Sequence, residues 1–467
     1  MIRRDALRLL GTSLGGVALS ACGDRTPTGP PRMGAPTIAN GFRFYAVKHS
    51  DAPLPGGNTC RTLLLDAAID DSGEIVYSAI DQSGTRGLYA ITLDYRRPVP
   101  EVVSERRIVR VGDVLPGGTP VLGISAYDVS PQGALVVVLE VPDPDATPAD
   151  PAQANEIWVD ENKGSLQRLV YRGLRTTDGH VLSGNLGDVD IHTGRSLLFV
   201  AWYTHADPNE GQPLPVGAAE DDVPRQGLFS IVGFDTRTCE LELHHEQIAS
   251  GDGGASIGLI DQHDDGHYVI QAQPSRARDT DETTSGVMSA ADAADGALLF
   301  SGRVGQHRVQ QRTTTRTGSA APLLLGAGGR EGGSFFGPRA GPNAYLAYVL
   351  HRTDGHVALY HHDLEIVESG DPSPGGSTVG AITPPVFGRH GEIYYTLLTR
   401  DGPEFCTTNG EEQRLLLSSF DKLANDKRKI TSLMIGHTTE GVDASGRLSL
   451  ATVFEDRKAA ITVGIPI

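Results

Sequence analysis

A unit of roughly 60 residues recurs along the chain, and this repeat constrains the possible folds more than any other feature. Each unit begins with a glycine-rich loop, which is clearest at residues 50–57, 112–118 and 370–376. A short apolar stretch follows each loop and leads to a four-residue turn that ends in glycine. These turn glycines are Gly73, Gly133, Gly194, Gly266, Gly391 and Gly446. A unit near Gly341 that has lost this glycine fills the longest gap, so seven units fit into the chain.

The turns and the stretches behind them predict β-structure. Asp70 or Ser130 at the first position of a turn and glycine at the fourth is the chemistry of a type I turn. Stretches rich in β-branched and aromatic residues follow, for example residues 74–79 and 134–141, and they are typical of strands. With the two stretches that come next, most units hold four short strands, here called a, b, c and d in chain order. In the sixth unit we expect strand c at residues 415–418.

Four antiparallel strands per repeat, without a long amphipathic helix, are typical of a β-propeller blade. We therefore predict an all-β chain that forms a β-propeller of seven four-stranded blades. The seventh unit offers only strands a, b and c before Ile467, whereas an additional strand at residues 42–47 precedes the first loop. We expect this N-terminal strand to complete the last blade as its outer strand, beside residues 459–463, because such closure removes exposed edges.

The repeat resembles a known family. The glycine-rich loops and residues 70–77 (DDSGEIVY) are similar to the tandem "NxxGxxAF" repeats of secreted bacterial proteins. More distantly, residues 156–160 (EIWVD) resemble TolB-type (PD40-like) propeller repeats. The resemblance covers residues 42–467 and is strongest in the first, second and sixth units. Asp70 stands where the family has asparagine. The resemblance implies a fold and an extracytoplasmic location, and no assigned chemistry.

The first 21 residues have the features of an export signal. Arg3 and Arg4 form a basic start that resembles a twin-arginine signal, although Ala6 stands where phenylalanine is usual. A short apolar run follows and ends in Leu-Ser-Ala before Cys22, which resembles the lipobox of bacterial lipoproteins. This resemblance implies cleavage before Cys22 and acylation of its thiol.

The expected organisation has three parts: a signal peptide (1–21), a lipidated cysteine with a Pro/Gly-rich flexible tether (22–39) and a single β-propeller domain (40–467). The lipid on Cys22 would anchor the protein to the periplasmic side of a membrane or at the cell surface. The formal net charge of −18 argues against nucleic acid as a partner. We expect a monomer without a cofactor, whose other partner is a protein or a glycan.

Three cysteines remain after Cys22, namely Cys60, Cys239 and Cys406. In an exported protein this number favours one disulfide and one free thiol, and the sequence does not choose the pair. No Cys-x-x-Cys motif is present, which argues against structural zinc. Two histidine pairs, 244–245 and 361–362, do not form a chelate on a strand, because neighbouring side chains point to opposite faces. We therefore predict no metal site, and we assign no catalytic residue.

One face of the predicted propeller carries more sequence than ring closure requires. The d–a and b–c loops leave this face, and four b–c loops are long, namely 142–155, 203–226, 273–295 and 400–413. Loops of this kind often carry function, although long insertions are also tolerated without one. The d–a loops repeat an aspartate, at Asp51, Asp113, Asp252 and Asp371. These residues form a candidate binding face; the alternative is that each carboxylate caps the backbone of its own tight loop.

Three functions remain open. The first is a binding or scaffold module that uses the loop-rich face, and it is favoured over an enzyme. The second is a propeller hydrolase or lyase that acts on polysaccharide, which would need acids or histidines converging at the central mouth. The third is a purely structural envelope lipoprotein.

Overall fold

In the computed structural model every described residue belongs to one compact unit, Pro36–Ile467. The structure describes residues 39, 41–64, 66–143, 153–161, 163–192, 196–205, 225–243, 255–263, 266–274, 298–305, 309–314, 333–342, 345–352, 355–361, 364–436 and 441–467. Within these ranges the helical structure is confined to short 3-10 turns such as η4 (Thr236–Thr238). No described helix is long and apolar enough to cross a membrane.

The described strands form seven antiparallel sheets, numbered here in chain order. The first sheet holds β2 (Cys60–Leu63), β3 (Ala68–Ile69), β4 (Ile75–Asp81), β5 (Arg86–Asp94) and β6 (Glu101–Arg110). The second holds β7 (Gly123–Val129), β8 (Leu135–Pro142), β9 (Gln153–Asp160) and β10 (Gln167–Val170). The third holds β11 (His180–His192), β12 (Ser196–His205), β13 (Arg225–Val232) and β14 (Glu240–Leu243).

The remaining sheets repeat this plan. The fourth holds β15 (Ala255–Gln262), β16 (His267–Pro274), β17 (Leu298–Arg303) and β18 (Val309–Thr314). The fifth holds β19 (Gly333–Ala340), β20 (Leu346–Arg352), β21 (Val357–His361) and β22 (Leu364–Glu368). The sixth holds β23 (Val379–Ile382), β24 (Val386–Phe387), β25 (Ile393–Thr399), β26 (Gly402–Thr408) and β27 (Gln413–Ser418). The seventh holds β28 (Ile430–Ile435), β29 (Leu448–Phe454), β30 (Ala459–Pro466) and β1 (Phe42–His49).

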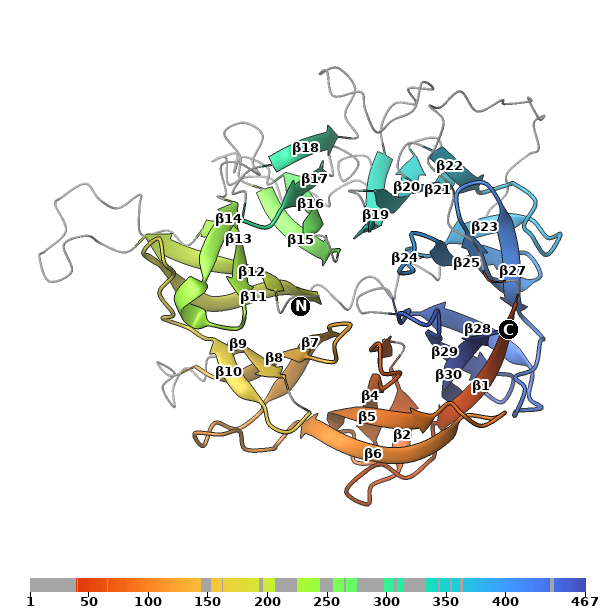
Figure 1. Cartoon of the computed structure of the whole chain (residues 1–467), viewed down its shortest axis with the longest axis horizontal. Coiled ribbons are helices and arrows are strands. Elements are labelled where there is room, and N and C mark those ends of the chain that lie inside the picture. The colour runs from red at the N-terminus through yellow and green to blue at the C-terminus, as the bar shows by residue number, and fades with distance from the viewer. Residues whose placement is uncertain are drawn as a thin grey trace, which may run out of the picture. The chain divides into compact units, whose positions relative to one another are not determined.

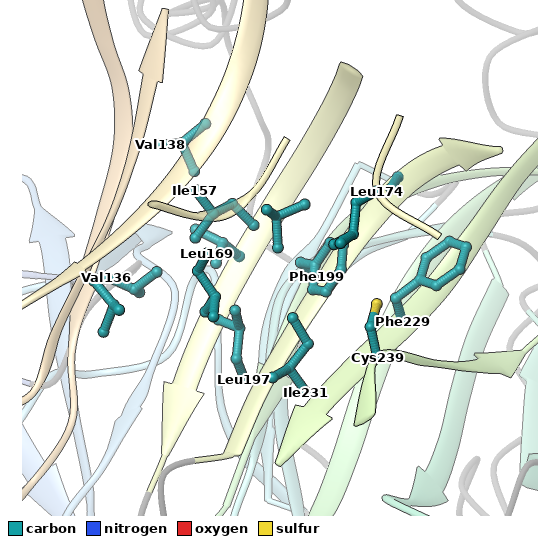
Figure 2. Packing of buried hydrophobic residues seen from close by; sticks show 14 of the residues in the cluster. Val136, Val138, Ile157, Leu169, Leu174, Leu197, Phe199, Phe229, Ile231 and Cys239 are labelled. Carbon is teal, nitrogen blue, oxygen red and sulfur yellow. The ribbon is translucent and has the colours of Figure 1, made fainter. Parts of the chain in front are cut away.

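Each sheet packs its apolar faces against the sheets before and after it. Figure 2 shows one such cluster, which contains Val138 and Ile157 of the second sheet and Phe199 and Phe229 of the third. The Phe199 and Phe229 rings are stacked with their centroids 5.6 Å apart, and both are fully buried. Similar clusters join every consecutive pair of sheets, and one joins the seventh sheet to the first. The fold is therefore an all-β β-propeller (Figure 1).

The N-terminal strand closes the seventh sheet, as the sequence predicts. β1 pairs antiparallel with β30, from Phe42 opposite Pro466 to His49 opposite Ala460. Figure 1 shows β1 and β30 side by side near the C-terminus. Phe44 packs edge-on against Phe405 of the sixth sheet, with ring centroids 6.4 Å apart. The first strand thus ties the end of the chain to its beginning.

Five of the a–b turns have the predicted geometry, and Gly194 of the third unit lies outside the described residues. In the first sheet Gly73 N donates to Asp70 O at 2.8 Å, and Asp70 N donates to Glu74 O at 3.0 Å. The same pair of bonds recurs in the turns that begin at Ser130, His263, Gly388 and Asp443. The φ angle of Gly73 is +82°, which explains why glycine recurs at this position.

The assignment of strands in the sixth unit was wrong. We expected a long loop at 400–413 followed by strand c at 415–418, but the loop is a two-residue turn and strand c is β26. The segment 413–418 belongs to β27, which is strand d. Gly402 and Pro403 are typical of a loop, but they occupy only the first two positions of a strand in which Phe405 and Cys406 are fully buried. The other three long b–c loops lie mostly outside the described residues.

Candidate functional site

One position on the innermost strands carries charged residues in four successive sheets. It stands one or two residues before the a–b turn, and its residue pairs with the residue eight positions later. The four charged residues are Asp128 on β7, Asp190 on β11, Asp261 on β15 and Arg339 on β19. We call them the axial row, because innermost strands surround the axis of a propeller. The same position holds Ala68, Val386 and Gly441 in the first, sixth and seventh sheets.

Each aspartate of the axial row binds the backbone of the next sheet. Ile191 N donates to Asp128 Oδ2 at 3.0 Å, and Gln262 N donates to Asp190 Oδ2 at 2.6 Å. Ala340 N donates to Asp261 Oδ2 at 2.6 Å. These three bonds join four consecutive innermost strands in one direction around the axis. A charged acceptor on a buried N–H forms a stronger bond than a neutral one does, so the row holds these strands in register.

Arg339 faces the carboxylates of the row. Its guanidinium Nη1 donates to Asp261 Oδ1 and forms an ion pair with it. Burial would lower the pKa of Arg339, but the carboxylates of Asp261, Asp190 and Asp128 outweigh burial and raise the pKa above its ordinary value. The Arg339 side chain is only 9% exposed. The guanidinium is therefore a buried, permanent cation that interacts electrostatically with carboxylates from three other sheets.

Two of the Arg339 nitrogens lack a partner. Nε and Nη2 are buried and donate no hydrogen bond to any described residue. Arginine donates five hydrogen bonds in a fixed planar arrangement, and its Nε and Nη2 form one edge with two parallel N–H groups. A buried donor without an acceptor costs about 1–3 kcal/mol, and more when it is charged. This edge is the feature of the axial row that calls for an acceptor from outside the described chain.

The a–b turns of four sheets meet at Asp71. Asp71 N donates to Pro131 O of the second sheet at 2.8 Å. Ala444 N of the turn before β29 donates to Asp71 Oδ1 at 2.8 Å, and Arg389 of the sixth sheet pairs with the same oxygen at 3.5 Å. The turn at Asp71 therefore joins the first, second, sixth and seventh sheets on the face opposite to the d–a loops.

Two of the aspartates that were singled out from the sequence, Asp113 and Asp371, serve their own d–a loops. Arg110 N donates to Asp113 Oδ2 at 2.8 Å, and Glu368 N donates to Asp371 Oδ2 at 2.9 Å. In both cases the carboxylate caps the end of the preceding strand. Asp51 has a φ of +82° and pairs with Lys458 of the seventh sheet. Asp252 lies outside the described residues, as do Cys22, Arg3 and Arg4.

The three described cysteines are free and buried. Cys60 begins β2 in the first sheet, Cys239 precedes β14 in the third, and Cys406 lies in β26 of the sixth. The expected disulfide does not form in the structure, because the three thiols belong to three separate hydrophobic clusters. Burial raises the pKa of Cys239 to about 12, which makes its thiol unreactive at neutral pH.

The histidine pairs contribute no metal centre that the structure describes. His361 lies in β21 against the rings of Tyr345 and Phe387, at centroid distances of 5.4 and 5.8 Å. His362 and the pair at 244–245 lie outside the described residues. Within the described ranges no group of three or more histidine, cysteine, aspartate or glutamate side chains is placed to hold a metal ion.

The sequence analysis missed the axial row, although a signal for it exists. Asp128 and Asp261 each stand two positions before the first residue of the a–b turn, and Asp190 occupies the corresponding position in the third unit. The aspartates of the d–a loops are more conspicuous in the sequence, because glycines surround them. Arg339 carries no such signal, because it stands in place of the repeated aspartate in the fifth unit, which has also lost the turn glycine.

No family model and no curated protein matches the chain. Among solved structures, it is similar to the GH93 α-L-arabinofuranosidase of Fusarium graminearum in complex with arabinobiose, with 9% identity and a TM-score of 0.37 over 90% of this chain and 98% of that one. The WD40 β-propeller domain of Doa1 has 9% identity and a TM-score of 0.35 over 90% and 97%. The α-L-arabinanase of Penicillium chrysogenum in complex with arabinobiose has 10% identity and a TM-score of 0.34 over 91% and 98%. These similarities are too remote to support a function.

Proposed function

We propose that the chain is a lipid-anchored extracytoplasmic β-propeller that binds a small polar ligand at the axial row. The unpaired Nε–Nη2 edge of Arg339 carries the proposal. A cation that is 91% buried and has an ion pair on one side only is costly to keep, and a bound acceptor would offset that cost. Small-molecule sites typically combine a few convergent polar groups with enclosing walls, and Arg339 with three carboxylates provides such groups.

The proposal assumes a closed ring of seven blades. The seven described sheets support this number, as do the hydrophobic clusters that link them in an unbroken cycle. The export signal and the lipobox-like sequence before Cys22 support the location. The location has its own test: Cys22→Ala should abolish labelling with radioactive palmitate, and labelling that persists would contradict lipidation.

Binding would be tested by thermal shift on the full chain in detergent. The panel contains calcium and magnesium chlorides, neutral saccharides, α-amino acids and dicarboxylates. A ligand that binds only the folded protein at 100 times its Kd stabilises by ~2.7 kcal/mol, which is measurable. We expect one class to raise the Tm of the wild type and of Arg97→Met, whose arginine side chain is 59% exposed, but not that of Arg339→Met.

Two outcomes would contradict the axial site. One is a shift that Arg339→Met retains in full, because the ligand would then bind elsewhere. The other is the absence of any shift across the panel, which would favour the structural alternative. Release of a hydrolysis product during incubation with a polysaccharide would instead support the enzyme that the sequence left open.

A further inference from the structure

The charge of the axial row restricts the ligand that Arg339 could hold. Three carboxylates and one guanidinium give the row a formal charge of −2 when all are ionised. Asp188, on the same strand as Asp190, adds a further carboxylate, which accepts from Ile260 N at 3.1 Å. A ligand with a net negative charge would be repelled by this field, because electrostatic interactions in a buried site are only weakly screened.

The hydrogen-bonding groups of the row restrict the ligand further. The Nε–Nη2 edge of Arg339 offers two parallel donors and therefore suits two neighbouring acceptor oxygens. Carboxylate oxygens accept more than one hydrogen bond, so Asp128, Asp190 and Asp261 suit a ligand that also donates. A hydroxyl group is both donor and acceptor. Two adjacent hydroxyls would accept from the arginine edge and donate to the carboxylates.

The rest of the same register is small and apolar. Ala68, Val386 and Gly441 occupy the equivalent position in the first, sixth and seventh sheets, and Ala68 and Val386 are buried. The row is thus charged in four sheets and free of polar side chains in the other three. A ring with hydroxyls along one edge and C–H groups along another would match both parts.

We infer that the axial row binds a neutral saccharide, with adjacent hydroxyls placed between the unpaired edge of Arg339 and the carboxylates of Asp190 and Asp261. The inference rests on the proposed function and adds the chemical class of the ligand. It predicts that recognition depends on the two-donor edge of arginine and not on charge alone. It also predicts that adding a charge to the ligand weakens binding.

The test compares probes that differ only in charge, on the full wild-type chain in detergent. Titration calorimetry would be run with a panel of neutral pentoses, hexoses and their disaccharides, and then with uronic acid and amino sugar analogues of any sugar that binds. We expect a neutral saccharide to bind, and its uronic acid analogue to bind at least ten times more weakly. We expect affinity for the neutral sugar to stay constant between 50 mM and 500 mM NaCl, because a neutral ligand is not screened.

Variants then locate the site. Arg339→Lys keeps the positive charge but loses the parallel donors, so affinity for the neutral sugar should fall at least tenfold; Arg97→Lys should leave it unchanged. The wild-type comparison does not depend on whether Arg339→Lys folds. Tighter binding of uronic acids, or Arg339-dependent binding of amino acids or dicarboxylates alone, would overturn the saccharide and leave the proposed site standing. If no probe binds in a manner that depends on Arg339, both proposals fail.

Discussion

Replacing Asp128 by alanine tests whether the axial row stabilises the ring. The Asp128 side chain is buried, and its two oxygens accept from Val129 N at 2.8 Å and from Ile191 N at 3.0 Å. The substitution removes the acceptor of two buried backbone N–H groups, one of which belongs to the next sheet. At ~1–3 kcal/mol for each unsatisfied donor, with some relief from water entering the vacated space, Asp128→Ala should lower the free energy of unfolding by about 2–4 kcal/mol.

Urea unfolding would measure this loss, with tryptophan fluorescence as the probe; Trp158 lies in the same sheet as Asp128 and Trp202 lies in the next. Asp113→Ala is the matched control: its carboxylate accepts one backbone N–H, from Arg110, and its side chain is 28% exposed. Because water can replace that acceptor, the control should lose less than about 1 kcal/mol. If Asp128→Ala costs no more than Asp113→Ala, the carboxylates of the axial row do not hold the sheets together.

Four further predictions concern the frame around the site. Gly73 and Gly84 both have a positive φ, but a Cβ at Gly73 would lie 2.4 Å from the Tyr95 ring, whereas a Cβ at Gly84 would meet nothing within 4 Å. In urea unfolding, Gly73→Ala should therefore lower the free energy of unfolding by at least ~1 kcal/mol more than Gly84→Ala does. Equal losses in the two variants would contradict this. Burial would raise the pKa of Asp81, but hydrogen bonds from serine, threonine and arginine neighbours lower it, so the stabilisation by this carboxylate is present above about pH 4 and is lost as the pH falls. Asp81→Asn should therefore lower the free energy of unfolding at about pH 7, and the difference from wild type should be smaller at about pH 3. A difference that does not change with pH would contradict the lowered pKa. Phe44→Ala should cost ~3–5 kcal/mol by calorimetry or urea, because it removes a buried ring at the joint between the last sheet and the first strand; a loss below ~1 kcal/mol would mean that closure contributes little. The three described cysteines should be inaccessible to Ellman's reagent in the folded protein, and all three should react once the protein is denatured, with no reductant added. Fewer than three reactive thiols would indicate a disulfide.

The fold could be predicted because its strongest signals are local. A turn such as 70–73 is specified by its own four residues, and the strand behind it by its β-branched and aromatic residues. The closure by β1 followed from counting strands at the two ends of the chain. The sixth unit was misread because Gly402 and Pro403 have local preferences for a loop, while the burial of Phe405 is decided by the neighbouring sheets. Tertiary packing overrides local propensity at that point.

The site was harder to predict because it depends on contacts between units. Asp128 and Ile191 are 63 residues apart, and nothing local indicates that one binds the other. Arg339 is separated from Asp190 and Asp128, whose carboxylates raise its pKa, by still more of the sequence. The prediction of a disulfide was wrong for the same reason. The number of cysteines says how many pairs are possible, but each of these three thiols lies in a different hydrophobic cluster.

The excess of acidic residues has a structural explanation that changes how the net charge should be interpreted. Of the aspartates described above, Asp70 forms a turn, Asp113 and Asp371 cap strands, and Asp128 and Asp190 join neighbouring sheets. Each accepts a backbone N–H, so these negative charges are used within the fold. A net charge of −18 in such a chain is therefore no sign of a cationic partner. The informative charge is the exceptional one, a buried arginine at a position where three preceding sheets carry aspartate.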